Sequence, residues 1–89
     1  VEIDLVAVDE DNRRLRLGTC KRNPARLPAA IHELRRHGER FITAHRRFEG
    51  WNIEHVGISP QIPAAVRAEL AGLGAIAQDL VDLTAGLSE

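Results

Sequence analysis

The sequence has no methionine, a single cysteine and only three aromatic residues. One cysteine cannot form an intramolecular disulfide, so we expect a reducing, cytoplasmic compartment and no disulfide framework. No apolar stretch approaches the roughly 18 residues that a membrane-spanning helix needs, and the first residues alternate with charges instead of forming a signal-peptide core. The composition therefore predicts neither a membrane partner nor export.

The missing methionine and the start at Val1 are typical of a piece of a longer polypeptide, and we expect the chain to be such a fragment. Its 89 residues, of which 44% are hydrophobic and 28% charged, suit one globular domain, and no linker interrupts 1–89. A domain this short buries only about 60 to 65% of the surface that its unfolded chain exposes. We therefore expect stability to depend on a neighbouring domain or on a second copy in a homo-oligomer.

The net charge of −1 hides a strong separation of charge along the chain. Residues 1–12 carry −5, residues 13–47 carry +9, and residues 48–89 carry −5. We call residues 13–47 the basic band. Eleven of the twelve bases in the chain are arginines, whose guanidinium groups can hold phosphates in a bidentate manner. The basic band predicts contact with nucleic acid, or alternatively a solvated surface that pairs with the acidic ends.

The first part of the chain predicts a β-hairpin made of strands 1–8 and 15–21. If Asp11-Asn12 is the turn, Val8 lies opposite Leu15 and Val6 opposite Leu17. One face of the hairpin then carries eight residues, namely Glu2, Asp4, Val6, Val8, Leu15, Leu17, Thr19 and Lys21. The other face is apolar as well, so we expect the hairpin to lie inside a sheet with both faces covered.

The remainder alternates between helical and strand patterns. A helix is predicted from Asn23 to Gly38, and strands at 41–47 and 53–58. A second helix follows 59–63 and ends at Gly72 or Gly74, a short strand spans 75–78, and a helical turn starts at Asp79. The order ββαββαβα predicts an α/β domain with a central mixed sheet flanked by helices, in which a parallel crossover follows the hairpin.

Two segments carry a resemblance to a known family: Glu2-Ile3-Asp4-Leu5-Val6-Ala7 and Gly18-Thr19-Cys20-Lys21. An Asp on one strand, a hairpin, then Glu-x-Lys and a helix is the core pattern of the PD-(D/E)xK nuclease superfamily. The chain most resembles the nuclease-like C-terminal domain that follows a P-loop ATPase domain in a family of prokaryotic ATPases. The resemblance implies a truncated restriction-endonuclease-like core and a parent protein that binds ATP. The chain has no Gly-rich phosphate loop, so the ATP site would lie elsewhere in that parent protein.

In the nuclease superfamily two carboxylates hold Mg²⁺ and a lysine stabilises charge on the phosphate. By this resemblance Asp4 matches the first carboxylate and Lys21 the lysine, as the catalytic pair. Thr19 stands where the second carboxylate belongs. Glu2 could supply the missing oxygen, or it forms an ion pair with Lys21. We expect Asp4 to be at most a weak metal ligand and the chain to hold no cofactor, with Mg²⁺ bound only if the nuclease site is active.

Three functions follow from these observations. The first is a catalytically impaired nuclease-like module that binds DNA through five arginines of the basic band, Arg26, Arg35, Arg36, Arg46 and Arg47. The second is a protein-interaction domain that docks on its own ATPase domain or on an acidic partner. The third is an active Mg²⁺-dependent nuclease.

Two further features have structural interpretations. Cys20 lies on the apolar face of the predicted hairpin, where we expect a small buried side chain instead of a nucleophile. The three aromatic residues could stack on bases beside the basic band, but core packing is their commoner use. The three are Phe41, Phe48 and Trp51.

Overall fold

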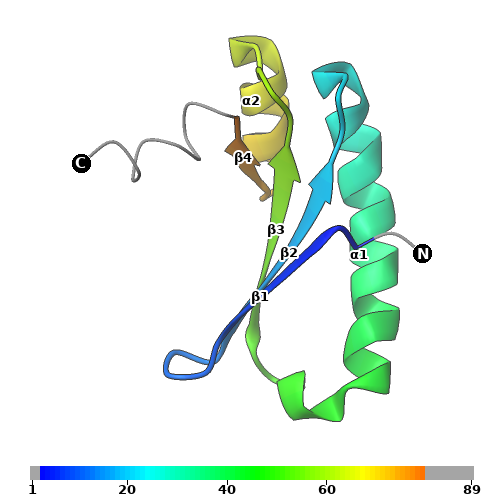
Figure 1. Ribbon diagram of the computed structural model, residues 1–89, viewed down its shortest axis with the longest axis vertical. Helices are drawn as coiled ribbons and strands as arrows, with labels where there is room; N and C mark the ends of the chain where they lie inside the picture. Colours follow the sequence, from blue (N-terminus) through cyan, green and yellow to red (C-terminus); the bar gives the residue numbers. More distant parts are fainter. Residues whose placement is uncertain (1–2, 80–89) are drawn as a thin grey trace.

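A four-stranded mixed sheet forms the centre of the structure, a computed structural model that describes residues 3–79 (Figure 1). The strands lie in the order β1-β2-β3-β4; β1 is antiparallel to β2, and the other neighbours are parallel. This arrangement confirms the predicted α/β class with a mixed sheet. The strands are β1 (Leu5–Asp9), β2 (Arg14–Cys20), β3 (Asn52–Ile58) and β4 (Ile76–Gln78).

The hairpin of β1 and β2 has the predicted register. Val8 pairs with Leu15 and Val6 pairs with Leu17. The loop is wider than the predicted two-residue turn, because 10–13 form the turn and Asp9 is the last paired residue of β1. The Asp9 carboxylate holds this loop by accepting hydrogen bonds from the Asn12 side chain at 2.8 Å and the Asn12 backbone amide at 3.3 Å.

The first helix, α1 (Leu27–Ala44), packs against β2 and β3 and is longer than predicted. Gly38 does not end it, and the predicted strand at 41–47 is wrong: α1 continues to Ala44 and a 3₁₀ turn follows at Arg46–Phe48. Glycine at this position reflects the close approach of α1 to β2 and does not act as a helix stop. A Cβ atom on Gly38 would lie only 2.9 Å from Leu17 Cδ1. Gly38 therefore allows α1 to lie close to β2, and the observed order of strands and α-helices is ββαβαβ.

The second helix, α2 (Ala64–Gly72), connects β3 to β4 where a helix and a strand were predicted. The chain leaves α2 through Gly74, whose φ of +75° suits glycine. The predicted helical turn with Leu80, Leu83 and Leu87 lies outside the described residues. Among residues 3–79, no helix combines the length and the apolar character required to cross a membrane.

Both helices cover the same face of the sheet, because a Cβ atom on Gly57 would touch both Leu27 of α1 and Leu70 of α2. The prediction that both faces of the hairpin are covered is wrong. β1 is an edge strand, α1 lies over β2 and β3, and neither helix covers the opposite face, on which Leu5 lies. Leu5, Val6 and Val8 are therefore 40%, 41% and 44% exposed. The buried core lies between the helices and the central strands, and its fully buried side chains include Leu15, Leu17, Leu27, Ile31, Leu34 and Leu70.

Candidate functional site

The candidate site lies at the carboxyl ends of β2 and β3. Because these strands are parallel, the residues that follow them meet at one edge of the sheet. The Lys21 amide donates to the Ile58 carbonyl at 2.9 Å, and the Ser59 hydroxyl donates to the Arg22 carbonyl at 3.2 Å. These bonds hold the two strand ends together beside a cavity of about 280 Å³, which is lined by Cys20, Lys21, Arg22, Ile58, Ser59 and Pro60.

Asp4 lies beside this edge, next to Thr19. One Asp4 carboxylate oxygen accepts a hydrogen bond from the Cys20 backbone amide at 2.8 Å and from the Thr19 hydroxyl at 3.4 Å. Thr19 is only 3% exposed, and its hydroxyl takes the position next to the Asp4 carboxylate where the resemblance places a second carboxylate. Within the described part of the chain, no group of three or more His, Cys, Asp or Glu side chains could hold a metal ion.

Lys21 is half-buried and lines the cavity. Of the residues that the structure describes, none forms an ion pair with Lys21. The expected pair with Glu2 lies outside the described residues. The structure thus brings the Asp4 carboxylate and the Thr19 hydroxyl into contact. Lys21 follows Thr19 by two residues in the sequence.

Cys20 is exposed, so the expectation of a buried cysteine is wrong. It lies on the face of the sheet opposite the helices. Partial burial raises the pKa of the Cys20 thiol, and the negative charge of Asp4 raises this pKa further. A thiol with a raised pKa carries less of the nucleophilic thiolate at neutral pH.

Asp4→Asn should increase the rate at which iodoacetamide alkylates Cys20 at pH 8. Removal of the Asp4 charge lowers the thiol pKa and so raises the thiolate fraction. A pKa change of one unit would alter that fraction by about tenfold; burial is the larger cause here, so we expect a smaller increase. Asp9→Asn is the matched control. Equal rates for Asp4→Asn and the unmodified protein between pH 7 and 9 would contradict the Asp4 effect.

The five arginines predicted to bind nucleic acid lie in separate places. Arg26 is exposed in a 3₁₀ turn (Pro24–Arg26) that precedes α1 near the strand ends, and Arg36 is exposed on the outer side of α1. Arg35, which was predicted to bind DNA, is half-buried, and its guanidinium donates to the Leu73 carbonyl after α2. Arg35 therefore joins α1 to the end of α2.

Arg46 and Arg47 lie in the 3₁₀ turn at the opposite end of the sheet (Figure 1). The Arg46 guanidinium is 3.8 Å from the Glu49 carboxylate, and that of Arg47 is 3.7 Å from the Glu10 carboxylate. The Arg47 guanidinium also stacks 4.6 Å from the centre of the Phe48 ring. These two arginines are thus partly neutralised by acids near them.

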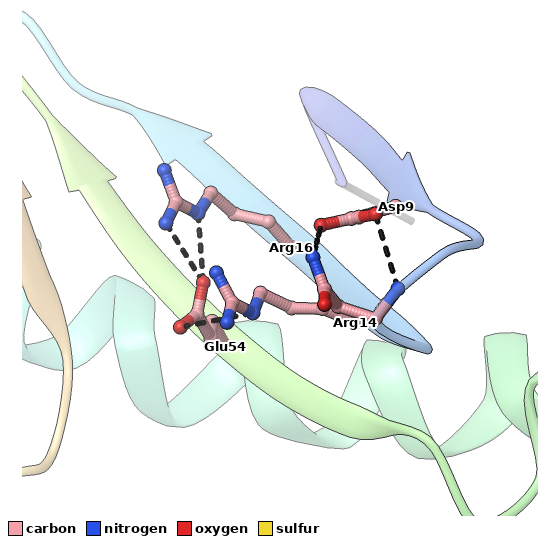
Figure 2. A network of polar contacts seen from close by, with 5 residues as sticks. Asp9, Arg14, Arg16 and Glu54 are labelled. Carbon is pink, nitrogen blue, oxygen red and sulfur yellow. Dashed lines mark hydrogen bonds and ion pairs between the residues drawn. The ribbon is translucent and has the colours of Figure 1, made fainter.

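Glu54 neutralises a further part of the basic band, as Figure 2 shows on the sheet face opposite α1. Its carboxylate accepts two hydrogen bonds from Arg16, at 2.8 and 3.0 Å, and lies 3.9 Å from the Arg14 guanidinium. Sequence analysis missed this contact. Glu54 lies opposite Arg16 only because β2 and β3 are neighbours, and no local pattern indicates that pairing.

Three bases near the cavity remain, and we call them the strand-end cations: Lys21, Arg22 and Arg26. None of them forms an ion pair with another described residue. Lys21 and Arg22 line the cavity, and Arg26 follows them in the adjoining 3₁₀ turn. Arg22 was not among the predicted site residues, although its position next to Lys21 could have indicated it.

The three aromatic residues pack against one another at the other end of the sheet. The Phe41 and Phe48 rings stack with their centres 5.8 Å apart, and Trp51 meets Phe48 edge to face at 5.0 Å. Phe48 is buried and joins the core. The expectation of core packing is confirmed, and the strand-end cations have no aromatic residue beside them.

His55 lies on the helix side of β3, beside a cavity of about 230 Å³ between β3 and α1. Burial lowers the pKa of His55 below its usual value near 6.5, and the positive charge of Arg35 lowers this pKa further. In the unfolded chain His55 binds a proton near pH 6.5, whereas in the folded protein it stays neutral to lower pH. The stability that depends on neutral His55 is therefore complete above pH 6.5 and decreases as the pH falls below that value.

His55→Gln should weaken the loss of stability between pH 7 and 5, because the variant has no group at this position that must remain unprotonated. The measurement is the free energy of unfolding from urea titrations at several pH values. His32→Gln, at an exposed position of α1, is the control and should leave the pH slope unchanged. Parallel slopes for all three proteins would show that His55 does not contribute.

Comparison of the chain with protein-family models, with curated proteins and with solved structures finds no match. The functional argument therefore rests on the geometry of the site.

Proposed function

We propose that this chain is a catalytically impaired module of the PD-(D/E)xK type that binds nucleic acid through phosphate contacts. The observation that carries this proposal is the contact of Asp4 with Thr19, two residues before Lys21. The resemblance requires an acid at the first strand next to the first position of an acid-x-Lys triplet; here Asp4 directly precedes β1 and Thr19 is the first residue of Thr19-Cys20-Lys21. In its parent protein the module would follow an ATPase domain, which would hold the ATP.

The contact also supports the loss of catalysis. Mg²⁺ keeps most of its water ligands unless carboxylates hold it, and a neutral hydroxyl gives it no charge. At this site Asp4 supplies one carboxylate, and its contacting oxygen already accepts hydrogen bonds from Thr19 and Cys20. The module would thus retain the framework of the nuclease site without the ability to hold its metal.

The strand-end cations support nucleic-acid binding. Lys21, Arg22 and Arg26 form no ion pair with a described carboxylate, so their charges are available to phosphates. Arg35, by contrast, is bonded to Leu73, while Arg46 and Arg47 each lie near an acid. We therefore assign the phosphate contacts to the strand-end cations, with Arg36 as an exposed base further along α1.

The test measures the affinity of the protein for duplex DNA of unrelated sequences by fluorescence anisotropy at several salt concentrations. Each phosphate contact should contribute about 0.9 to the slope of log affinity against log salt. Lys21→Ala/Arg22→Ala should therefore reduce this slope by about 2. Arg46→Ala/Arg47→Ala removes the same charge at the opposite end of the sheet and should change the slope less.

Two results would reject the proposal. One is no measurable binding to any DNA or RNA at about 50 mM salt, where phosphate contacts are strong. The other is binding to polyglutamate without binding to DNA, which would favour the module that docks on its ATPase domain or on an acidic partner. If the slope falls equally in both double variants, the protein binds nucleic acid but the phosphate contacts are spread over the whole basic band.

A further inference from the structure

The outer edge of β1 is a strand edge that carries exposed apolar side chains. β1 lies at one end of the strand order and pairs only with β2 among the described strands. All the large hydrophobic side chains that are exposed in the described part of the chain belong to this strand. They are Leu5, Val6 and Val8.

The hydrogen-bonding groups at this edge follow from the pairing of β2. The Asn52 amide donates to the Arg13 carbonyl and the Lys21 amide donates to the Ile58 carbonyl, so the odd-numbered residues of β2 bond to β3. Successive residues of a strand direct their amide and carbonyl groups to alternate sides, so the even-numbered residues of β2 bond to β1. The even-numbered residues of β2 face odd-numbered residues of β1, so Leu5, Ala7 and Asp9 are the residues of β1 that bond to β2. The amide and carbonyl groups of Val6 and Val8 therefore point to the free edge.

Asp4 departs from the regular pairing, because its amide donates to the carbonyl of Gly18, the residue that faces Leu5. Beyond this point the edge lacks an inward charge, a lysine, a proline and a bulge, which are features by which proteins usually prevent strand addition. The run Leu5–Val8 has none of these in its sequence, and its register against β2 is uninterrupted. Leu5 lies on the face opposite the helices, where it covers Gly18, while Val6 and Val8 lie on the other face. An added strand could thus bury apolar surface on both faces.

The charges beside this edge select the kind of strand. Residues 3–12 contain four acids and no base. Glu10 lies 3.7 Å from Arg47, and the other three acids flank the apolar run, with Asp4 on one side and Asp9 and Asp11 on the other. Two copies of β1 paired edge to edge would bring these like charges together, which is destabilising. A strand with apolar residues at its centre and basic residues at both ends would complement the edge.

We propose that the free edge of β1 binds an extended segment of a partner protein, apolar at its centre and basic at both ends. The segment extends the sheet by hydrogen bonds to Val6 and Val8, as in β-strand addition. Its basic ends lie near Asp4 and Asp9. This interaction is independent of nucleic-acid binding. It uses the acidic edge strand β1, whereas the strand-end cations follow β2 at the side where β2 meets β3.

The test uses two synthetic peptides with the same central Val-Thr-Val-Thr segment, one flanked by two lysines at each end and the other by two glutamates. We expect the lysine-flanked peptide to bind at least tenfold more tightly at low salt, with a smaller ratio at high salt. Amide hydrogen exchange followed by NMR should slow at Val6 and Val8, while Ala7, which already bonds to β2, should change little.

Val6→Pro is the decisive variant. Proline removes the amide that faces the free edge but none that bonds to β2, so an edge strand can accept it. The variant should keep the circular dichroism of the parent protein and lose peptide binding. Val6→Lys places a charge on the edge and should weaken binding if Val6→Pro does not fold.

Three results would overturn the proposal: equal affinity for the two peptides, no binding of either peptide, or binding that both Val6 variants retain. Protection of Val6 and Val8 that increases with protein concentration in the absence of peptide would also overturn it, because a second copy would then occupy the edge.

Discussion

Gly38→Ala should destabilise the native protein but should stabilise the variant in which Leu17 has been shortened to alanine. The new methyl group on Gly38 would lie 2.9 Å from Leu17 Cδ1, and Leu17 is fully buried and has little freedom to move. Overpacking of this kind costs about 1 to 3 kcal/mol, and the better helix propensity of alanine offsets about 1 kcal/mol of that cost. A net loss of stability of up to about 2 kcal/mol is therefore expected.

Leu17→Ala alone should cost about 3 to 5 kcal/mol, because it leaves a cavity under α1. In that background the Gly38→Ala methyl group enters free space, so the helix propensity of alanine adds up to about 1 kcal/mol. Urea unfolding of the four proteins gives the coupling, for which we expect about 1 to 3 kcal/mol. Gly72→Ala, at a position with no atom within 4 Å of its Cβ, should behave identically in both backgrounds. An equal effect of Gly38→Ala in both would contradict the close approach.

Thr19→Glu should destabilise the protein strongly and make it responsive to Mn²⁺. The position is 3% exposed and touches the Asp4 carboxylate, so the introduced charge is buried next to a like charge. An uncompensated buried charge costs about 3 to 5 kcal/mol, less as the pH falls and the carboxylate takes up a proton. A divalent ion would bridge the two carboxylates and recover part of this loss.

The measurement is the melting temperature with and without Mn²⁺, together with calorimetric titration. The unmodified protein and Thr19→Gln, which has the size of the glutamate variant without its charge, should show no response to the ion. If the unmodified protein binds Mn²⁺ at micromolar concentration and Asp4→Ala abolishes this binding, the hypothesis of an active nuclease would be favoured instead. A folded Thr19→Glu protein that does not respond to Mn²⁺ would show that Asp4 and Thr19 lack the geometry of a metal site.

Prediction from sequence succeeded where the interactions are local. The register of β1 and β2 follows from a short loop and from alternation with a period of two, because a slip of one residue would turn Leu15 and Leu17 away from the core. The contact of the Asp4 carboxylate with Thr19 was predicted from the same register, although the Asp4 amide bonds to the Gly18 carbonyl, one residue off that register. The strands at 52–58 and 76–78 and the helix between them also lie close to their predicted positions, because prolines and glycines mark their limits.

Prediction from sequence failed where the role of a residue depends on a helix or strand that is far away in the sequence. Gly38 has the low helix propensity of a stop signal, yet α1 passes through it because β2 lies directly below. Leu5, Val6 and Val8 have the composition of a covered strand, yet all three are exposed. The helices lie over β2 and β3 and not over Val6 and Val8, and Leu5 lies on the opposite face, which neither helix covers.

The sequence by itself therefore determined the hairpin, its register and the position of Thr19 beside Asp4, since these depend on residues within about twenty positions of each other. Only the tertiary structure decided which charges of the described residues are paired with one another. Arg16 is neutralised by Glu54, which is 38 positions away, and Arg35 is bonded to Leu73 at the same separation. Lys21 and Arg22 line the cavity at the strand ends. Charge adds up along a sequence, but the partner of each charge depends on which strands and helices become neighbours when the chain folds.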